Sequence, residues 1–145
     1  MRNVIIVILS CILSQSVWAR DDIATYSIAD LLATEKAKTA LSDIPLYFGV
    51  SPTPQVANTY GEVMTNKKTN AFMKSDLEAC QWVMLSALKS LQQRAVKEGM
   101  NAVINIQSYY KKREFISETE FECGAGAVMA GVTLKGTLVK IENNK

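Results

Sequence analysis

The sequence predicts an α+β domain in which a mostly antiparallel sheet carries one long helix and a shorter N-terminal helix packed on one face. Three observations predict this class. A capped stretch at residues 75–99 has the apolar periodicity of a helix. Two β-rich segments precede it and three follow it, bounded by turn-forming residues. A weaker helical pattern comes before them all, so the expected order is helix, two strands, long helix and three strands.

The N-terminal half is expected to contain the short helix and the first two strands. Residues 27–41 are predicted to be helical, because Ser27 can cap the first turn and Asp30 follows three residues later. The apolar and aromatic run 44–50 ends at a Ser-Pro-Thr-Pro sequence, which predicts a strand followed by a turn. Residues 61–69 form the second candidate strand.

The long helix is the clearest element. Ser75 and Glu78 form a capping box at its start, and Gly99 is a natural stop. Its apolar face repeats at spacings of three and four residues and consists of Leu77, Cys80, Met84, Ala87, Leu88, Leu91 and Ala95. Its predicted solvated side consists of Gln81, Lys89, Gln92, Gln93, Lys97 and Glu98. Trp82 and Val83 widen the apolar side, which indicates a second packing partner.

Three strands are predicted after this helix. Residues 101–110 are rich in β-branched side chains and partly alternate between apolar and polar. The basic segment 111–113 is expected to be a solvated hairpin end rather than a binding patch. Residues 115–123 can return as another strand, and 127–141 form a long final strand.

Several glycines lie between residues 124 and 136, and they do not form a nucleotide-binding motif. Residues 124–126 (Gly-Ala-Gly) are predicted to form a bend, because they lack the lysine and hydroxyl of a P-loop and do not open a helix. Gly131 and Gly136 lie within the final strand and indicate bulges or close backbone approach.

A secretory signal peptide is predicted at residues 1–19. Arg2 supplies the positive charge, residues 4–13 form an apolar run, and cleavage is expected between Ala19 and Arg20. A transmembrane anchor would need roughly 20 apolar residues, and this run is shorter. We therefore expect export followed by cleavage.

Cys11 offers the alternative of a lipid anchor, because its context faintly resembles a lipoprotein box. The apolar run before it is short, and Ile12 and Leu13 continue that run beyond it. We expect Cys11 to be discarded with the signal, and membrane association only if it is lipidated. Residues 20–145 are then expected to form a single α+β domain that is periplasmic or secreted.

The composition argues against several classes of function. The chain carries 16 Lys and Arg against 14 Asp and Glu, which gives no electrostatic footprint for nucleic acid or an anionic membrane. Histidine, the most common general base and metal ligand, is absent. No acid–base constellation is visible, so we expect no enzymatic activity, no cofactor and no nucleic-acid partner.

Cys80 and Cys123 are the two cysteines that follow the predicted signal. A pair of cysteines in an oxidising compartment most often forms a disulfide, so we expect these two to be joined. The alternative is a thiol pair for redox work or soft-metal binding. Redox motifs usually hold their cysteines close together, as in C-x-x-C, and this spacing does not.

Two further patterns could attract a metal ion. Glu118, Glu120 and Glu122 alternate, so on a strand they would project from one face, either into solvent or toward a cation. Methionines could bind Cu(I) together with the cysteines, although their irregular spacing favours core packing. These methionines are Met64, Met73, Met84, Met100 and Met129.

Six phrases carry a resemblance over nearly the whole mature chain. They are 47–49 (YFG), 65–70 (TNKKTN) leading into Phe72, 79–82 (ACQW), 101–106 (NAVINI), 122–126 (ECGAG) and 130–132 (AGV). Together they resemble the small exported proteobacterial proteins catalogued as "excinuclease ATPase subunit". That name is not expected to describe the function, because such an ATPase needs Walker motifs and zinc-binding cysteines, which this chain lacks, and access to cytoplasmic DNA, from which export would remove it.

The second half more loosely resembles two other groups. The resemblance to the YbjQ-like family, whose heavy-metal binding is conjectural, implies a compact α+β fold that can assemble into rings. The resemblance to the RcsF-type envelope-stress lipoproteins implies a disulfide-braced domain that works through protein contacts. Cys80 on the long helix and Cys123 before the last strand suit one such brace between helix and sheet.

The sequence therefore predicts a non-enzymatic protein-interaction or envelope-associated module, acting on a protein partner or by self-association. The outward members of the aromatic pairs 47–48 and 109–110, together with Trp82, are candidates for an assembly surface. The alternative function is a soft-metal or small-ligand binder that uses the cysteine thiols.

Overall fold

A computed structural model describes residues 20–142. The predicted signal segment, with Cys11 and Ala19, lies outside the described residues. Along the chain the elements are β1 (Asp22–Ser27), α1 (Ile28–Leu32), α2 (Glu35–Ala40), β2 (Leu46–Phe48), β3 (Val56–Asn70), α3 (Asp76–Lys97), β4 (Ala102–Ser108), the 3-10 turn η1 (Tyr110–Lys112), β5 (Glu120–Ala125) and β6 (Met129–Ile141).

The six strands form one sheet built around β6. Strand β3 pairs with one side of β6 along almost its whole length, and β5 and β4 share the other side, one after the other. Outside them lie β1, antiparallel to β5, and β2, which is parallel to β4. Because all other pairings are antiparallel, the predicted α+β class with a mostly antiparallel sheet is confirmed.

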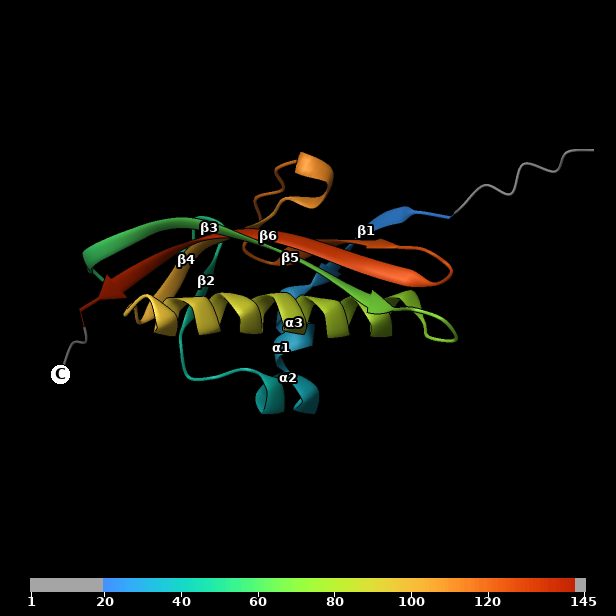
Figure 1. The fold of residues 1–145 in the computed structure, drawn as a ribbon, viewed down its shortest axis with the longest axis horizontal. Helices are drawn as coiled ribbons and strands as arrows, with labels where there is room; N and C mark the ends of the chain where they lie inside the picture. The colour runs from blue at the N-terminus through green and yellow to red at the C-terminus, as the bar shows by residue number, and fades with distance from the viewer. Residues whose placement is uncertain (1–19, 143–145) are drawn as a thin grey trace, which may run out of the picture.

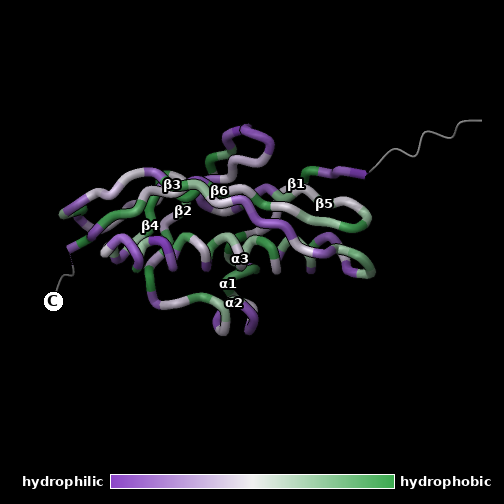
Figure 2. Tube along the Cα trace, viewed as in Figure 1, coloured by the Kyte–Doolittle hydropathy of each residue, from purple (hydrophilic) through white to green (hydrophobic). Residues whose placement is uncertain are grey.

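All three helices lie on one side of this sheet, with α3 directly against it (Figure 1). Hydrophobic and hydrophilic stretches alternate along α3, as expected for a helix with one buried face (Figure 2). Its buried side chains pack with those of the central strands, including Val103, Ile106, Val132, Leu134 and Leu138. Among the described residues no helix has the length and hydrophobicity needed to span a bilayer. The sheet face turned away from α3 is called the outer face below.

The N-terminal region differs from the sequence prediction in two ways. The expected helix 27–41 is split into α1 and α2, because Thr34 is extended and its hydroxyl accepts a hydrogen bond from Ala37 N at 3.2 Å, which starts a new helix. Strand β1 was not predicted. Most of its residues are exposed or half-buried, so it lacks the apolar alternation on which strand prediction depends.

Two residues of α3 lie on the opposite side from the one predicted. Leu77, assigned to the apolar face, is 49 % exposed in the first turn. Gln92, assigned to solvent, is buried, because its side chain bonds to the backbone of the segment before β2. Its Oε1 accepts from Ser42 N at 2.9 Å, and its Nε2 donates to Ser42 O at 3.0 Å and Ile44 O at 2.8 Å.

The region after β4 is also rearranged. Strand β5 is shorter than the predicted strand 115–123, and residues 109–119 instead form a loop that stands off the outer face (Figure 1). The bend expected at 124–126 lies partly within β5, and the chain turns at 126–129, where Gly126 N donates to Met129 O at 2.8 Å. The hairpin predicted around 111–113 is reduced to one antiparallel bridge, in which the backbone N–H groups of Ser108 and Phe115 each donate to the other residue's carbonyl, at 3.1 and 2.9 Å. Strands β4 and β5 pair with β6 rather than with each other along their length.

Candidate functional site

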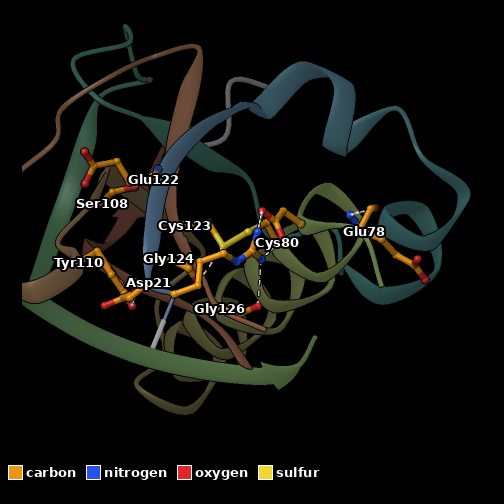
Figure 3. The surroundings of a disulfide bond; sticks show 12 residues. Asp21, Glu78, Cys80, Ser108, Tyr110, Glu122, Cys123, Gly124 and Gly126 are labelled. Carbon is orange, nitrogen blue, oxygen red and sulfur yellow. Dashed lines mark hydrogen bonds and ion pairs between the residues drawn. A yellow bond between two sulfur atoms is a disulfide. The ribbon is translucent and has the colours of Figure 1, made fainter. Parts of the chain in front are cut away.

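Cys80 and Cys123 are joined by a disulfide, with an S–S distance of 2.07 Å and a Cα–Cα distance of 5.9 Å. Both residues are fully buried, one in the second turn of α3 and the other in the middle of β5 (Figure 3). The bond therefore fastens the helix to the sheet. It also occupies both sulfur atoms, so the thiol chemistry of the alternative metal-binding function would require prior reduction.

The residues on either side of Cys123 face the outer side of the sheet, as strand alternation requires. Glu122 is almost completely buried there: its Oε1 lies 3.2 Å from Arg113 Nη2, and its backbone N donates to Ser108 Oγ at 2.9 Å. The three alternating glutamates do not gather as a cation site would require, since Glu118 precedes the strand and Glu120 is exposed. Within residues 20–142 no group of three or more Cys, Asp or Glu side chains could hold a metal ion.

The glycines near the end of β5 and the start of β6 are explained by Tyr110. A Cβ atom on Gly124 would lie 2.2 Å from Tyr110 Oη, and one on Gly131 would lie 3.3 Å from Tyr110 Cε2. The ring therefore lies directly over bare backbone on the outer face. Of the two alternatives predicted for these glycines, Gly131 shows close approach, by the Tyr110 side chain. Gly136 shows both, because a Cβ would lie 2.8 Å from Val103 Cγ1 and the register shift of β4 lies opposite it.

Beside this ring is a hollow of about 430 Å³, bounded by Tyr110, the glycine backbone, the β5–β6 turn and the start of the described chain. Three charged residues reach it: Arg20, Asp21 and Lys68. The β5–β6 turn lines this hollow with Ala127, Val128 and Met129, so its wall is largely apolar and suits a small apolar group.

Two of the three charged residues are neutralised by neighbours. Arg20 binds Asp76 through two hydrogen bonds, of 2.7 and 3.2 Å, and this contact raises the pKa of Arg20. Asp21 accepts a hydrogen bond from Lys111, which lowers the pKa of Asp21, and a longer one of 3.4 Å from Tyr110 Oη. Burial raises the pKa of Tyr110, so its hydroxyl keeps its proton at neutral pH. Lys68 is then the one charged residue of this rim that has no ion pair within residues 20–142.

Exposed apolar side chains gather beside the hollow. Phe72 is 63 % exposed, Met73 90 %, Val128 57 % and Met129 47 %. Val128 and Met129 line the hollow at the β5–β6 turn and the first residue of β6, and Phe72 and Met73 lie in the loop after β3. The two segments are held side by side, because Ala71 N donates to Val128 O at 2.6 Å. We call these four residues the apolar tip; the turn between β5 and β6 that contributes two of them is coloured as hydrophobic in Figure 2.

The aromatic residues proposed from the sequence do not form one surface. Trp82 lies on α3 under Lys36, whose Nζ is 5.3 Å from the ring centroid. Tyr109 lies on the outer face, where Lys135 Nζ is 3.7 Å from its ring centroid. Because the sheet separates these two positions, the apolar tip is the better candidate.

The remaining candidates are also dispersed. Tyr47 packs against a small cluster outside the main core, whereas Phe48 is buried. Among the methionines, Met84 is fully buried, and Met64, like two residues of the apolar tip, is exposed.

Sequence reasoning missed the apolar tip. The available signal was the adjacent pair Phe72 and Met73 in a segment that precedes a helix cap, where polar residues are usual.

No protein-family model matches the chain, and neither the curated proteins nor the solved structures give a match. The resemblances inferred from the sequence therefore remain predictions, and the function has to be argued from the geometry.

Proposed function

We propose that this chain is an exported, non-enzymatic protein-interaction module of the periplasm or extracellular space. Its docking surface is the apolar tip, and a side chain of the partner enters the neighbouring hollow. The observation that carries this proposal is that four exposed apolar side chains lie on two adjoining segments, one of which lines the neighbouring hollow. Single exposed apolar residues are normal, but a cluster that borders a hollow is typical of a binding surface.

The surroundings of the tip support this proposal because they hold it in place. Arg20 bridges the two loops: its Nη2 donates to Gly126 O at 3.2 Å and binds Asp76 at the start of α3. The disulfide connects the same end of α3 to β5. A surface that is already ordered loses less conformational entropy when a partner binds, so more of the contact energy remains as affinity.

The proposal is tested by placing a photo-crosslinking amino acid at Met73 or Val128 in the full chain, expressed in its own envelope. Val96 is the matched control, since it is also apolar and 62 % exposed but lies near the other end of α3. A helix of 22 residues is about 33 Å long, so the control samples a different surface.

We expect a discrete adduct with the same protein from Met73 and Val128, and none from Val96. Replacing Phe72 by aspartate should abolish the adduct formed from Met73 while leaving the thermal unfolding temperature unchanged, because Phe72 contributes little buried area. Equal crosslinking at all three positions, or none at the tip, would contradict the proposal.

A further inference from the structure

Strand β3 has a long unpaired edge. It contains 15 residues, and among the described strands its only hydrogen-bonding neighbour is β6. Its other side exposes a row of backbone N–H and C=O groups, which can template the addition of another strand. Two register shifts disturb the start of β3, but residues 61–70 pair with β6 without interruption. This regular segment is suited to further pairing.

We infer that β3 pairs antiparallel with β3 of a second copy of this chain, about a twofold axis that passes through Thr65. A twofold axis that brings two identical edges together antiparallel must stand perpendicular to the sheet. Both α3 helices then lie on the same face of the combined sheet. Residues directly opposite each other must also point to the same face.

This requirement restricts the possible registers. Odd-numbered residues of 61–70 face the helix, since Thr65 lies opposite the buried Leu134. Even-numbered residues face outward, since Lys68 lies opposite Gly131, over which Tyr110 packs. Odd residues can therefore oppose only odd ones, and even residues only even ones. Near full overlap of the regular segment, the twofold axis passes through residue 64, 65 or 66.

Charge selects among these three registers. With the axis at Thr65, Glu62 lies opposite Lys68 of the second copy, and symmetry repeats this pair. With the axis at Met64, Glu62 would oppose Asn66. With the axis at Asn66, Lys68 would oppose Met64. Opposite charges placed directly across a strand pair stabilise it. Only the register centred on Thr65 pairs opposite charges. Within residues 20–142 Lys68 has no ion pair, and Glu62 has one long contact, 3.8 Å from Lys135 Nζ of its own chain, which leaves its carboxylate able to reach the second copy's Lys68 as well.

The first test is charge exchange, with the mass of the full chain measured by sedimentation over a dilution series. We expect a monomer–dimer equilibrium. Lys68→Glu should raise the dimer dissociation constant about tenfold, because two attractive pairs become repulsive. The exchange Glu62→Lys with Lys68→Glu should restore the original value. Lys89→Glu makes the same change in charge on the exposed side of α3 and should leave the equilibrium unaltered.

The second test fixes the register. Thr65→Cys places a thiol at the twofold axis, where opposing Cα atoms are about 4.5–5.5 Å apart, a distance that a disulfide can span. Oxidation should therefore link two copies covalently. Thr69→Cys is the matched control on the same face of the same strand, because residue 69 lies opposite residue 61 and its thiols are far apart.

The inference is overturned if the chain is monomeric at every concentration, which would mean that the lysines of β3 prevent its edge from pairing with another strand. It is also overturned by a dimer that is insensitive to Lys68→Glu, or by equal crosslinking at positions 65 and 69. These outcomes leave the proposed function untouched, since the apolar tip is tested separately and in the envelope.

Discussion

Removing the Cys80–Cys123 disulfide should lower the free energy of unfolding by about 4 kcal/mol. The two cysteines are 43 positions apart, and the chain-entropy relation for closing a loop of that length gives ~4 kcal/mol at 25 °C. With roughly 2.1 cal/mol/K of unfolding entropy per residue over about 120 residues, this corresponds to a fall of about 15 °C in the unfolding temperature.

The assay compares thermal unfolding, followed by circular dichroism, of the oxidised protein and of the variant Cys80→Ala/Cys123→Ala. Both sulfur atoms are buried, so the variant also loses packing contacts. The wild-type chain in reductant separates the two effects, because it keeps the sulfur atoms and loses only the bond. A fall of less than about 4 °C in reductant, which corresponds to ~1 kcal/mol, would refute the entropic reasoning.

Two further substitutions test the packing that the sequence did not reveal. Gln92→Leu should lower the free energy of unfolding, measured with denaturant, by about 2–4 kcal/mol, because it leaves three backbone groups of the segment before β2 without partners. Gln93→Leu, on the exposed side of α3, is the control and should lower it little. Equal losses for the two variants would contradict the role assigned to Gln92. Gly124→Ala should cost about 1–3 kcal/mol, because its Cβ would collide with the Tyr110 ring. In a Tyr110→Ala background that cost should disappear, and strict additivity of the two substitutions would show that the ring is not the cause.

The sequence predicted the structure correctly where the spacing of apolar residues indicates which side of a helix is buried. The α3 pattern predicted the buried position of Cys80, and with it the attachment of the helix to the sheet. It failed at Gln92, because a polar side chain that binds backbone from a distant segment has the same sequence signature as a solvated one. Gly131 could be recognised as a site of close approach, but its partner could not, since Tyr110 lies in a loop whose path depends on tertiary pairing.

The apolar tip escaped prediction for a related reason. Its two loops are far apart in the sequence and meet only because β3 and β5 both end beside the start of β6. Phe72 and Val128 are each unremarkable as single exposed residues, and only their juxtaposition suggests a surface. Strand pairing sets that juxtaposition, and local sequence patterns do not report it.

The position of the disulfide connects the braced core to the proposed docking surface. Cys80 lies in the second turn of α3, directly after the loop that carries Phe72 and Met73. Cys123 lies in β5, directly before the turn that carries Val128. The bond thus joins the two segments that present the apolar tip, whereas β3 is held to the sheet along β6, away from both cysteines. Loss of the bond should therefore increase the mobility of the apolar tip more than that of the edge of β3. The oxidising compartment that export would provide keeps the bond formed, and so it keeps the surface that we assign to partner binding ordered.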